Sequence, residues 1–324
     1  MARALELAAR VRATTSPNPW VGCVIVPSGG GEWFEGATRP PGGPHAEVVA
    51  LTAAGAHARD GTLFTTLEPC SHTGRTPPCT DAIVAAGIAR VVVGIDDPDP
   101  RVSGTGIAAL RAAGVEVEVG TLADEVRAQL APYLKHRTTG RPWLVLKLAA
   151  TLDGRTAAAD GSSRWITGEA ARADAHRLRA ESDAVIVGAG TVRADDPTLT
   201  VRHVAGHDPL RVVLGRIPPG AAVLPALELE GDLGSVLDEL GRRHVLQALV
   251  EGGATVAGDF HRAGLVDRYV VYLAPALAGG DDGRPLLAGP GAATIDEVWR
   301  GRIVSVDRLG DDLRVELEPT CSPA

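Results

Sequence analysis

Two short strings constrain this chain more than any other part of its sequence. His45 and Glu47 lie in residues 44–48 (Pro-His-Ala-Glu-Val), and Cys70 and Cys79 begin and end residues 70–79 (Cys-Ser-His-Thr-Gly-Arg-Thr-Pro-Pro-Cys). One imidazole and two thiolates fill three corners of a tetrahedral zinc site, and an open fourth corner distinguishes a catalytic site from a structural one. The fold must therefore bring two distant segments together around one ion.

The residues around these ligands predict how the site is built. Pro44 comes directly before His45, and Pro77-Pro78 directly before Cys79, so we expect both ligands to open helices. The helix dipoles would then help to hold thiolates in their anionic form. Glu47 is close enough to reach a zinc-activated water without binding the metal. It would take a proton from the attacking water and return protons to a ring nitrogen and the departing ammonia, which predicts a hydrolytic deaminase.

Other interpretations of the strings remain open. His, Cys and Glu can form a structural zinc site or a buried polar cluster, although an acid two residues after the histidine has no role in a structural site. His72 could in principle be a fourth ligand that closes the site. We expect it to be a loop or substrate residue, since a histidine two residues after a ligand cysteine points away from the metal about as often as toward it.

Composition narrows the class of protein. The 324 residues, 45% of them hydrophobic, are enough for two domains. A net charge of −8 and only 3% aromatic residues argue against nucleic acid as a partner and favour a small-molecule substrate. No apolar run could span a bilayer and the N-terminus has no apolar signal core, so we expect a cytoplasmic protein. Cys23 and Cys321 are the only cysteines outside the motif, which argues against a disulfide framework.

Helical and strand patterns alternate along the chain, which predicts an α/β fold. In the first part we expect helices at 2–11, from 45, from 80, at 107–112 and at 123–134, and strands at 21–26, 62–67, 90–95 and 115–119. The charged, helix-breaking segment 135–142 marks the boundary between domains 1–140 and 141–324. In the second part we expect strands at 143–149, 184–187, 210–214, 245–250, 268–273, 303–307 and 313–317, helices at 169–179, 233–240 and from 255, and a loop at 278–290.

With residues 16–23 (Ser-Pro-Asn-Pro-Trp-Val-Gly-Cys), the two zinc strings resemble the bifunctional riboflavin-biosynthesis deaminase/reductases, within the cytidine-deaminase-like superfamily. The common superfamily pattern has two residues between its cysteines, whereas this chain has eight, 71–78, as is typical of the riboflavin branch. The resemblance implies a cytidine-deaminase-like α/β/α domain in which Asn18 contacts the pyrimidine and residues 71–76 shape the pocket. Asn18 between two prolines is equally well explained as a turn residue.

Strings in the second domain resemble the reductase half of the same enzymes. They are residues 147–155 (Lys-Leu-Ala-Ala-Thr-Leu-Asp-Gly-Arg), 163–167 (Ser-Arg-Trp-Ile-Thr), 177–183 and 190–202. The resemblance implies a dihydrofolate-reductase-like α/β domain that uses NADPH, and no Gly-x-Gly-x-x-Gly string opens this domain. Residues 251–255 (Glu-Gly-Gly-Ala-Thr) could let a phosphate approach a helix N-terminus, although such a turn is more often just a turn.

The resemblance also implies the residues of the reductase site. Ser163, Arg179 and Arg202 would hold the ribose phosphate, and Leu199 and Glu251 would face the substrate. Lys147 and Asp153 are both candidates for polarising or protonating the reacting carbon, and the sequence does not decide between them. The residues that would line the cofactor are Ala149, Trp165, Thr167, Thr191, Asp195, Gly253, Ala254, Thr255, Val256, Ala257, Gly258 and Asp259.

The chain departs from the family between Leu214 and Leu233. Relatives usually have another strand there and an acidic residue at the position of Gly215, where this chain has a Pro/Gly/Ala-rich link. We hypothesise that Arg216 supplies charge for the 2′-phosphate of NADPH, which an unchanged NADPH affinity in an Arg216→Ala variant would contradict. The shortened segment 215–232 also leaves open a chain that only deaminates, its reductase domain being inactive.

Taken with the resemblance, the sequence implies a bifunctional enzyme with Zn²⁺ and NADPH as cofactors. The reactions would be hydrolytic deamination of 2,5-diamino-6-ribosylamino-4(3H)-pyrimidinone 5′-phosphate, then NADPH-dependent reduction of its ribosyl group to ribityl, giving 5-amino-6-(5-phosphoribitylamino)uracil. A nucleic-acid editing protein is a rival from another class, but it would need a basic groove that the acidic balance does not favour. We expect a homo-oligomer, with a dimer as the first choice.

Overall fold

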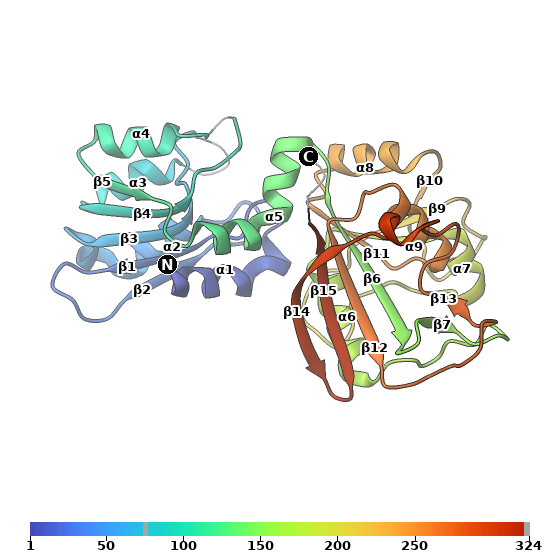
Figure 1. Cartoon of the computed structure of the whole chain (residues 1–324). Coiled ribbons are helices and arrows are strands. Elements are labelled where there is room, and N and C mark those ends of the chain that lie inside the picture. The colour runs from blue at the N-terminus through green and yellow to red at the C-terminus, as the bar shows by residue number, and fades with distance from the viewer. Residues whose placement is uncertain (74–76, 101, 321–324) are drawn as a thin grey trace. The chain divides into compact units, whose positions relative to one another are not determined.

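The computed structural model describes residues 1–73, 77–100 and 102–320 and divides into two compact units, Met1–Gly140 and Arg141–Ala324 (Figure 1). Cys321 and residues 74–76 of the expected pocket segment lie outside the described residues. Among the described residues, no helix combines the length and the apolar character that crossing a membrane requires.

The first unit is a five-stranded sheet between two layers of helices. The sheet order is β2-β1-β3-β4-β5, in which β1 pairs antiparallel with β2 and β3, and β3, β4 and β5 run parallel (Figure 1). Helix α1 contacts α5, whereas α2 contacts α3, which contacts α4. The elements are α1 (Ala2–Thr15), β1 (Gly22–Val26), β2 (Phe34–Ala37), α2 (Ala46–Ala54), a 3-10 turn (Gly55–Ala58), β3 (Thr62–Leu67), α3 (Cys79–Ala85), β4 (Arg90–Ile95), α4 (Thr105–Ala112), β5 (Glu116–Val119) and α5 (Ala123–Thr139).

Helix α5 continues beyond the end expected at Leu134, so the prediction of a break at 135 was wrong. Tertiary contacts hold the helix across Pro132, which cannot donate a backbone hydrogen bond. The Tyr133 hydroxyl lies 3.0 Å from both carboxylate oxygens of Asp97, and the Gln129 amide donates to Leu5 O at 2.9 Å. The helix ends only at Gly140, whose φ of 73° is the left-handed conformation typical of a helix C-terminus.

The second unit is built on an eight-stranded sheet of order β10-β9-β8-β11-β6-β12-β15-β14. The strands from β10 to β12 are parallel, and β15 and β14 add antiparallel at one edge. The elements are β6 (Trp143–Thr151), β7 (Arg155–Ala157), α6 (Glu169–Ala180), β8 (Ala184–Gly188), α7 (Ala189–Asp195), β9 (Leu210–Leu214), β10 (Leu227–Leu229), α8 (Leu233–Arg242), β11 (Gln247–Val250), α9 (Ala254–Arg262), β12 (Arg268–Ala274), β13 (Arg284–Pro285), a 3-10 turn (Ile295–Glu297), β14 (Gly301–Leu309) and β15 (Asp312–Pro319).

Alternate residues of β6 enter the cores on the two faces of this sheet, as the pleat of a strand requires. Leu144, Leu146 and Leu148 pack with residues of α8 and α9. Val145 packs on the other face with residues of α6. Lys147 therefore lies on the α6 face, which is where the polar side chains of the candidate reductase site gather.

The segment between Leu214 and Leu233 contains a strand, so the expectation of a bare link was wrong. β10 pairs parallel with β9, with Leu227 opposite Val212, and the backbone N–H of Gly215 donates to Leu229 O at 3.0 Å. Leu229 also packs against the core of the sheet. The strand is too short, and its Leu-Glu-Leu sequence too weak a pattern, to be recognised without its neighbour. The expected loop at 278–290 likewise contains β13, which pairs with β7.

Candidate zinc centre and reductase site

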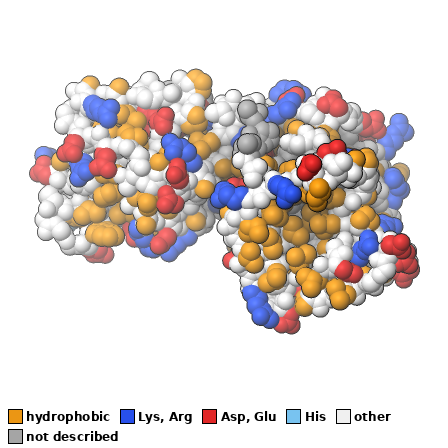
Figure 2. Space-filling view, in the orientation of Figure 1, with side chains coloured by type: hydrophobic (Ala, Val, Ile, Leu, Met, Phe, Trp, Pro, Cys, Tyr) orange, Lys and Arg blue, Asp and Glu red, His pale blue; other side chains and the backbone are white. Residues whose placement is uncertain are grey.

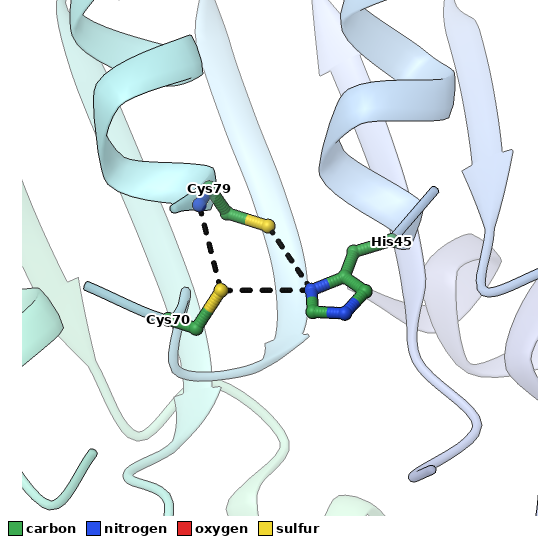
Figure 3. Close-up of side chains that lie close together, drawn as sticks. All are labelled: His45, Cys70 and Cys79. Carbon is green, nitrogen blue, oxygen red and sulfur yellow. Dashed lines mark hydrogen bonds between the residues drawn. The ribbon is translucent and has the colours of Figure 1, made fainter. Parts of the chain in front are cut away.

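His45, Cys70 and Cys79 come together in the first unit, as the two strings predicted (Figure 3). His45 is the N-terminal capping residue of α2, Cys79 is the first residue of α3, and Cys70 lies in the loop after β3. His45 Nδ1 lies 3.6 Å from Cys70 Sγ and 3.3 Å from Cys79 Sγ, and the three ligand atoms are all within 4.8 Å of one another. Ligands of a tetrahedral zinc ion lie about 3.5–3.8 Å apart, so this donor set fits zinc.

The two sulfur atoms have unequal affinities for a proton. Hydrogen bonds from the Cys79 thiol, the His45 ring and the Cys79 backbone N–H lower the pKa of Cys70 to about 4, and the Cys79 nitrogen lies 3.4 Å from Cys70 Sγ. The hydrogen bond between the two cysteines raises the pKa of Cys79, and burial adds to this effect. The hydrogen bond between His45 and Cys70 raises the pKa of His45. A thiolate is thus already favoured at Cys70, and thiolate sulfur is the ligand that a soft or borderline cation selects.

Glu47 lies in the first turn of α2, beside the three ligands. Its side chain is buried, with 4% of the residue exposed, and its Oε2 lies 3.5 Å from Cys79 Sγ. Burial raises the pKa of the Glu47 carboxyl. A carboxyl group buried beside metal-ligand side chains is costly for folding, and such groups concentrate at functional sites. The structure therefore has an acid that can exchange protons next to the candidate zinc centre.

A second buried acid, Glu68, fixes the loop beside Cys70, and the sequence interpretation missed it. Its carboxylate accepts hydrogen bonds from the backbone N–H groups of Asp97, Gly104, Gly106 and Ile107, at 2.9–3.1 Å. Four donors from a distant segment thus converge on one side chain. The signal in the sequence was an acid two residues before a ligand cysteine, directly after a strand made of uncharged residues.

The structure shows no role in the zinc centre for two other predicted residues of this unit, His72 and Asn18. His72 is not part of the ligand group found among the described residues, and its place as a loop or substrate residue stays a prediction. Asn18 is half-buried, and its backbone N–H donates to Thr15 O at 2.9 Å in a turn. The Arg137 guanidinium reaches the carbonyl of the neighbouring Pro17 at 3.5 Å, which ties this turn to α5.

Arg179 and Glu251 form a buried ion pair on the α6 face of the second unit. Arg179 Nε and NH2 donate to the two carboxylate oxygens of Glu251 at 2.8 and 3.0 Å, and their side chains are only 9% and 11% exposed. Burial alone would raise the pKa of Glu251, but the charge and hydrogen bonds of Arg179, together with the charge of Lys147, outweigh burial and lower the pKa. Arg179 NH1 also donates to Thr200 O at 2.6 Å, so most of its N–H groups are already used.

Lys147 and His176 extend this polar cluster. The Lys147 ammonium lies 5.8 Å from the centre of the Tyr272 ring, and burial lowers its pKa. His176 Nδ1 accepts the backbone N–H of Arg202 at 3.1 Å, and burial followed by the charge of Arg179 lowers the His176 pKa to about 4. His176 was not predicted, and its only signal in the sequence was its spacing of three residues from Arg179 on one helix.

Several predicted cofactor residues meet at the carboxyl ends of the parallel strands. α7 follows β8 directly, Gly253 caps α9 shortly after β11, and the Gly253 backbone N–H donates to Thr191 Oγ1 at 3.2 Å. Open parallel sheets bind ligands at this edge. Two predicted residues are instead part of the cores: Ala257 is fully buried, and Leu199 is 5% exposed.

Ser163 and Trp165 line a hollow of about 270 Å³ near the ends of β6 and β12. Trp165 is 71% exposed, and the Arg172 guanidinium lies 4.8 Å from its ring centre. Asp153, a candidate proton donor, instead accepts hydrogen bonds from Thr151 Oγ1 at 2.5 Å and from two backbone N–H groups. These three bonds lower its pKa to about 2, so the group is ionised near neutral pH and a poor proton donor.

Comparisons with known proteins match both units. The family model of the cytidine and deoxycytidylate deaminase zinc-binding region matches residues 1–95, and that of the RibD C-terminal domain matches residues 142–315. The chain is 44% identical to the riboflavin biosynthesis protein RibD of Mycobacterium tuberculosis, covering 98% of this chain and 96% of that one. It is 40% identical to RibD of Escherichia coli, covering 98% of both chains.

Solved structures of similar proteins match this chain over nearly its whole length. The structure of Acinetobacter baumannii RibD, form 1, has a TM-score of 0.91 at 40% identity and covers 99% of this chain and 98% of that one. A diaminohydroxyphosphoribosylaminopyrimidine deaminase/5-amino-6-(5-phosphoribosylamino)uracil reductase from Thermotoga maritima has a TM-score of 0.88 at 35% identity, covering 98% and 97%. Similarity at this level extends over both units and is not limited to one motif.

Proposed function

The chain belongs to the RibD family, and we propose that its two reactions take place at the two sites described above, deamination at the His45 centre in Met1–Gly140 and reduction beside Glu251 in Arg141–Ala324. It is a bifunctional deaminase and reductase of riboflavin biosynthesis, with zinc and NADPH as cofactors. The name of the Thermotoga relative supports a diaminopyrimidine ribosyl phosphate as the first substrate and its deaminated product as the second.

The convergence of His45 Nδ1 with the two cysteine sulfurs, beside a buried carboxyl group, supports the first reaction more than any other observation. His45, Cys70 and Cys79 would hold the zinc, which supplies a Lewis acid that activates water. The Glu47 carboxylate would accept one proton from the attacking water and give it to the pyrimidine ring nitrogen. It would then carry the second proton of that water, from the hydroxyl group now on the ring carbon, to the leaving ammonia.

For the second reaction, the residues of the carboxyl edge position the two ligands. NADPH supplies the hydride, and Ser163 and Arg202 would hold the phosphate of the substrate by charge-assisted hydrogen bonds. Within the described residues, the Arg202 guanidinium donates through NH1 to the hydroxyls of Thr198 and Thr200, at 2.7 and 3.0 Å, so its Nε and NH2 remain as donors for a phosphate. Lys147 is the better candidate for the proton donor, because burial lowers its pKa toward neutrality whereas Asp153 is held ionised.

The rival interpretation, a chain that only deaminates, rested on the shortened segment 215–232. The structure keeps a strand in this segment, and the RibD C-terminal family model matches through it. The segment therefore still adds a strand to this edge of the sheet, which supports assigning both activities to the chain.

Arg216 is our candidate for recognition of the NADPH 2′-phosphate. It is exposed and follows Gly215, which lies at the carboxyl end of β9 with a φ of 95° and faces Ala189 at the start of α7. We expect Arg216→Ala to weaken NADPH binding about 10- to 100-fold and to leave NADH binding unchanged, since a hydrogen bond to a charged group contributes about 1.5–3 kcal/mol. Titration with both nucleotides measures this. An exposed arginine elsewhere in the unit, in an Arg300→Ala variant, is the control, and equal loss of both nucleotides would contradict the assignment.

We propose that the chain forms a homodimer through β14 and β15. Ile303, Val306 and Leu313 are 59%, 57% and 37% exposed there, and Figure 2 shows hydrophobic side chains gathered over this part of the sheet. β14 is also an edge strand with unpaired backbone groups, and such edges favour association. Sedimentation of the chain should give a dimer and that of Val306→Lys a monomer, whereas a monomeric unchanged chain would contradict the proposal.

A cytoplasmic location stays a prediction, supported by the free thiols of Cys23, Cys70 and Cys79.

A further inference from the structure

The loop that carries Cys70 is held by contacts with two different helices. At the first helix, α3, the backbone N–H of Cys79 donates to Cys70 Sγ at 3.4 Å, and that of Thr80 donates to Cys70 O at 3.2 Å (Figure 3). These bonds come from the segment that supplies another ligand of the candidate zinc centre. The contacts with the second helix, α4, come from a segment that carries no ligand.

Glu68 connects the Cys70 loop to the start of α4. Its Oε1 accepts the backbone N–H groups of Gly106 and Ile107 at 2.9 and 3.1 Å. Its Oε2 accepts those of Gly104 and Asp97 at 3.0 and 3.1 Å. The first N–H groups of a helix have no partner within that helix, and the capping residue Gly104 has no side chain to accept them. Glu68 therefore caps α4 from a distant part of the chain, and the helix dipole favours a carboxylate at this end.

The two neighbours of Cys70 in the chain also contact the start of α4. A Cβ atom on Gly106 would lie 1.9 Å from Pro69 O, so glycine is needed for the helix to approach the loop backbone this closely. Ser71 Oγ lies 2.8 Å from Thr105 Oγ1, which is hydrogen-bond distance. Residues on both sides of Cys70 are thus fixed against one helix.

We propose that Glu68 is a positioning residue for the zinc centre, which fixes the Cys70 loop to the start of α4 and so holds Cys70 Sγ within reach of the other two ligand atoms. The inference rests on the proposed function, because it takes the His45 centre to bind zinc. Groups that orient metal ligands through hydrogen bonds contribute to metal binding, and their replacement typically lowers metal affinity about 10- to 100-fold.

The test is the zinc affinity of the full chain, measured by competition with a chelator of known affinity. Glu68→Gln should weaken zinc binding about 10- to 100-fold, because glutamine keeps one acceptor oxygen and turns an amide group toward the other N–H donors. Gly106→Ala should also weaken zinc binding, because the new methyl group displaces the Pro69 carbonyl. In excess zinc both variants should recover most of their ammonia release, since Glu47 and the three ligands are unchanged.

Two control variants make similar changes elsewhere in the chain. Asp183→Asn alters a carboxylate of the second unit whose Oδ2 accepts the backbone N–H groups of Leu246 and Gln247 at 2.7 and 3.0 Å. Gly29→Ala adds a methyl group at a position where no described atom lies within 4 Å. Both variants should bind zinc as tightly as the unchanged chain.

The comparison of stability with zinc affinity separates positioning from a merely structural role. If Glu68→Gln and Gly106→Ala unfold more easily but bind zinc as tightly as the unchanged chain, the inference is overturned. If these variants do not fold, Ser71→Ala decides, because it removes only the contact with Thr105. It should weaken zinc binding about threefold, and an unchanged affinity would overturn the inference. An unchanged chain that binds no zinc would instead contradict the proposed function itself.

Discussion

Replacing Glu47 with glutamine is expected to slow the release of ammonia by about 10³-fold, since general acid–base catalysis contributes 10²–10⁴. Glutamine has nearly the same size and fills the same buried position, but it cannot accept the proton of the attacking water. His45, Cys70 and Cys79 are unchanged in this variant, so it should bind one zinc ion per chain as before. Ammonia release and zinc content are measured on the same preparation.

Two further variants serve as controls for the Glu47→Gln experiment. Glu125→Gln, which changes an exposed acid in the first turn of α5, should release ammonia at the unchanged rate. Cys79→Ser should lose both zinc and ammonia release, because it removes a ligand and not the proton shuttle. Ammonia release by Glu47→Gln at the rate of the unchanged chain would show that another group moves the proton, and the assignment of Glu47 would be wrong.

Replacing Glu251 with glutamine is expected to lower the free energy of unfolding of the second unit by about 3–5 kcal/mol and to abolish reduction. The variant leaves the Arg179 guanidinium, 9% exposed, without its carboxylate partner, and an unpaired buried charge has this cost. Urea unfolding gives the stability. NADPH oxidation with the deaminated intermediate gives the activity.

A double variant separates the effect of the Arg179–Glu251 pair on stability from its effect on reduction. Arg179→Met with Glu251→Leu replaces both charges by apolar side chains of similar size, so most of the lost stability should return. Reduction should not return, because the substrate loses its polar contacts. A double variant that reduces the intermediate normally would show that the pair is only structural, and a Glu251→Gln variant as stable as the unchanged chain would contradict the cost of unpairing.

Acid should weaken the second unit in two stages. His176 has its pKa lowered to about 4 in the folded chain from an ordinary 6.5, so it stays neutral while the unfolded chain takes up a proton. The stability that this provides is present above pH 6.5 and falls as the pH drops from 6.5 toward 4. Glu251 also has a lowered pKa, so its contribution is complete above its ordinary 4.5 and is lost at lower pH.

The zinc ligands could be predicted from the sequence because their chemistry and their local structure are both written in short strings. A proline before His45 and two before Cys79 start helices wherever those helices pack. The strands β3 and β4 could also be predicted, because both are short runs rich in β-branched and apolar residues, and their predicted ends agree with the structure.

The features that could not be predicted from the sequence depend on contacts between distant segments of the chain. α5 continues through Pro132 because Tyr133 and Gln129 bond to residues of other elements, and β10 exists because β9 lies beside it. The roles of Glu68 and His176 arise only when backbone N–H groups from far along the chain converge on them. Arg179 was expected to bind phosphate, and its pairing with Glu251 across 72 residues was not expected.

One chain carries two separate active sites, and NADPH oxidation by the Glu47→Gln variant is the decisive test of their independence. Given the deaminated intermediate, this variant should oxidise NADPH at the rate of the unchanged chain, and given the diamino substrate it should oxidise almost none. If the unchanged chain, with zinc bound, oxidises no NADPH when the intermediate is supplied, or if Glu47→Gln reduces neither compound, the account of two independent sites is contradicted.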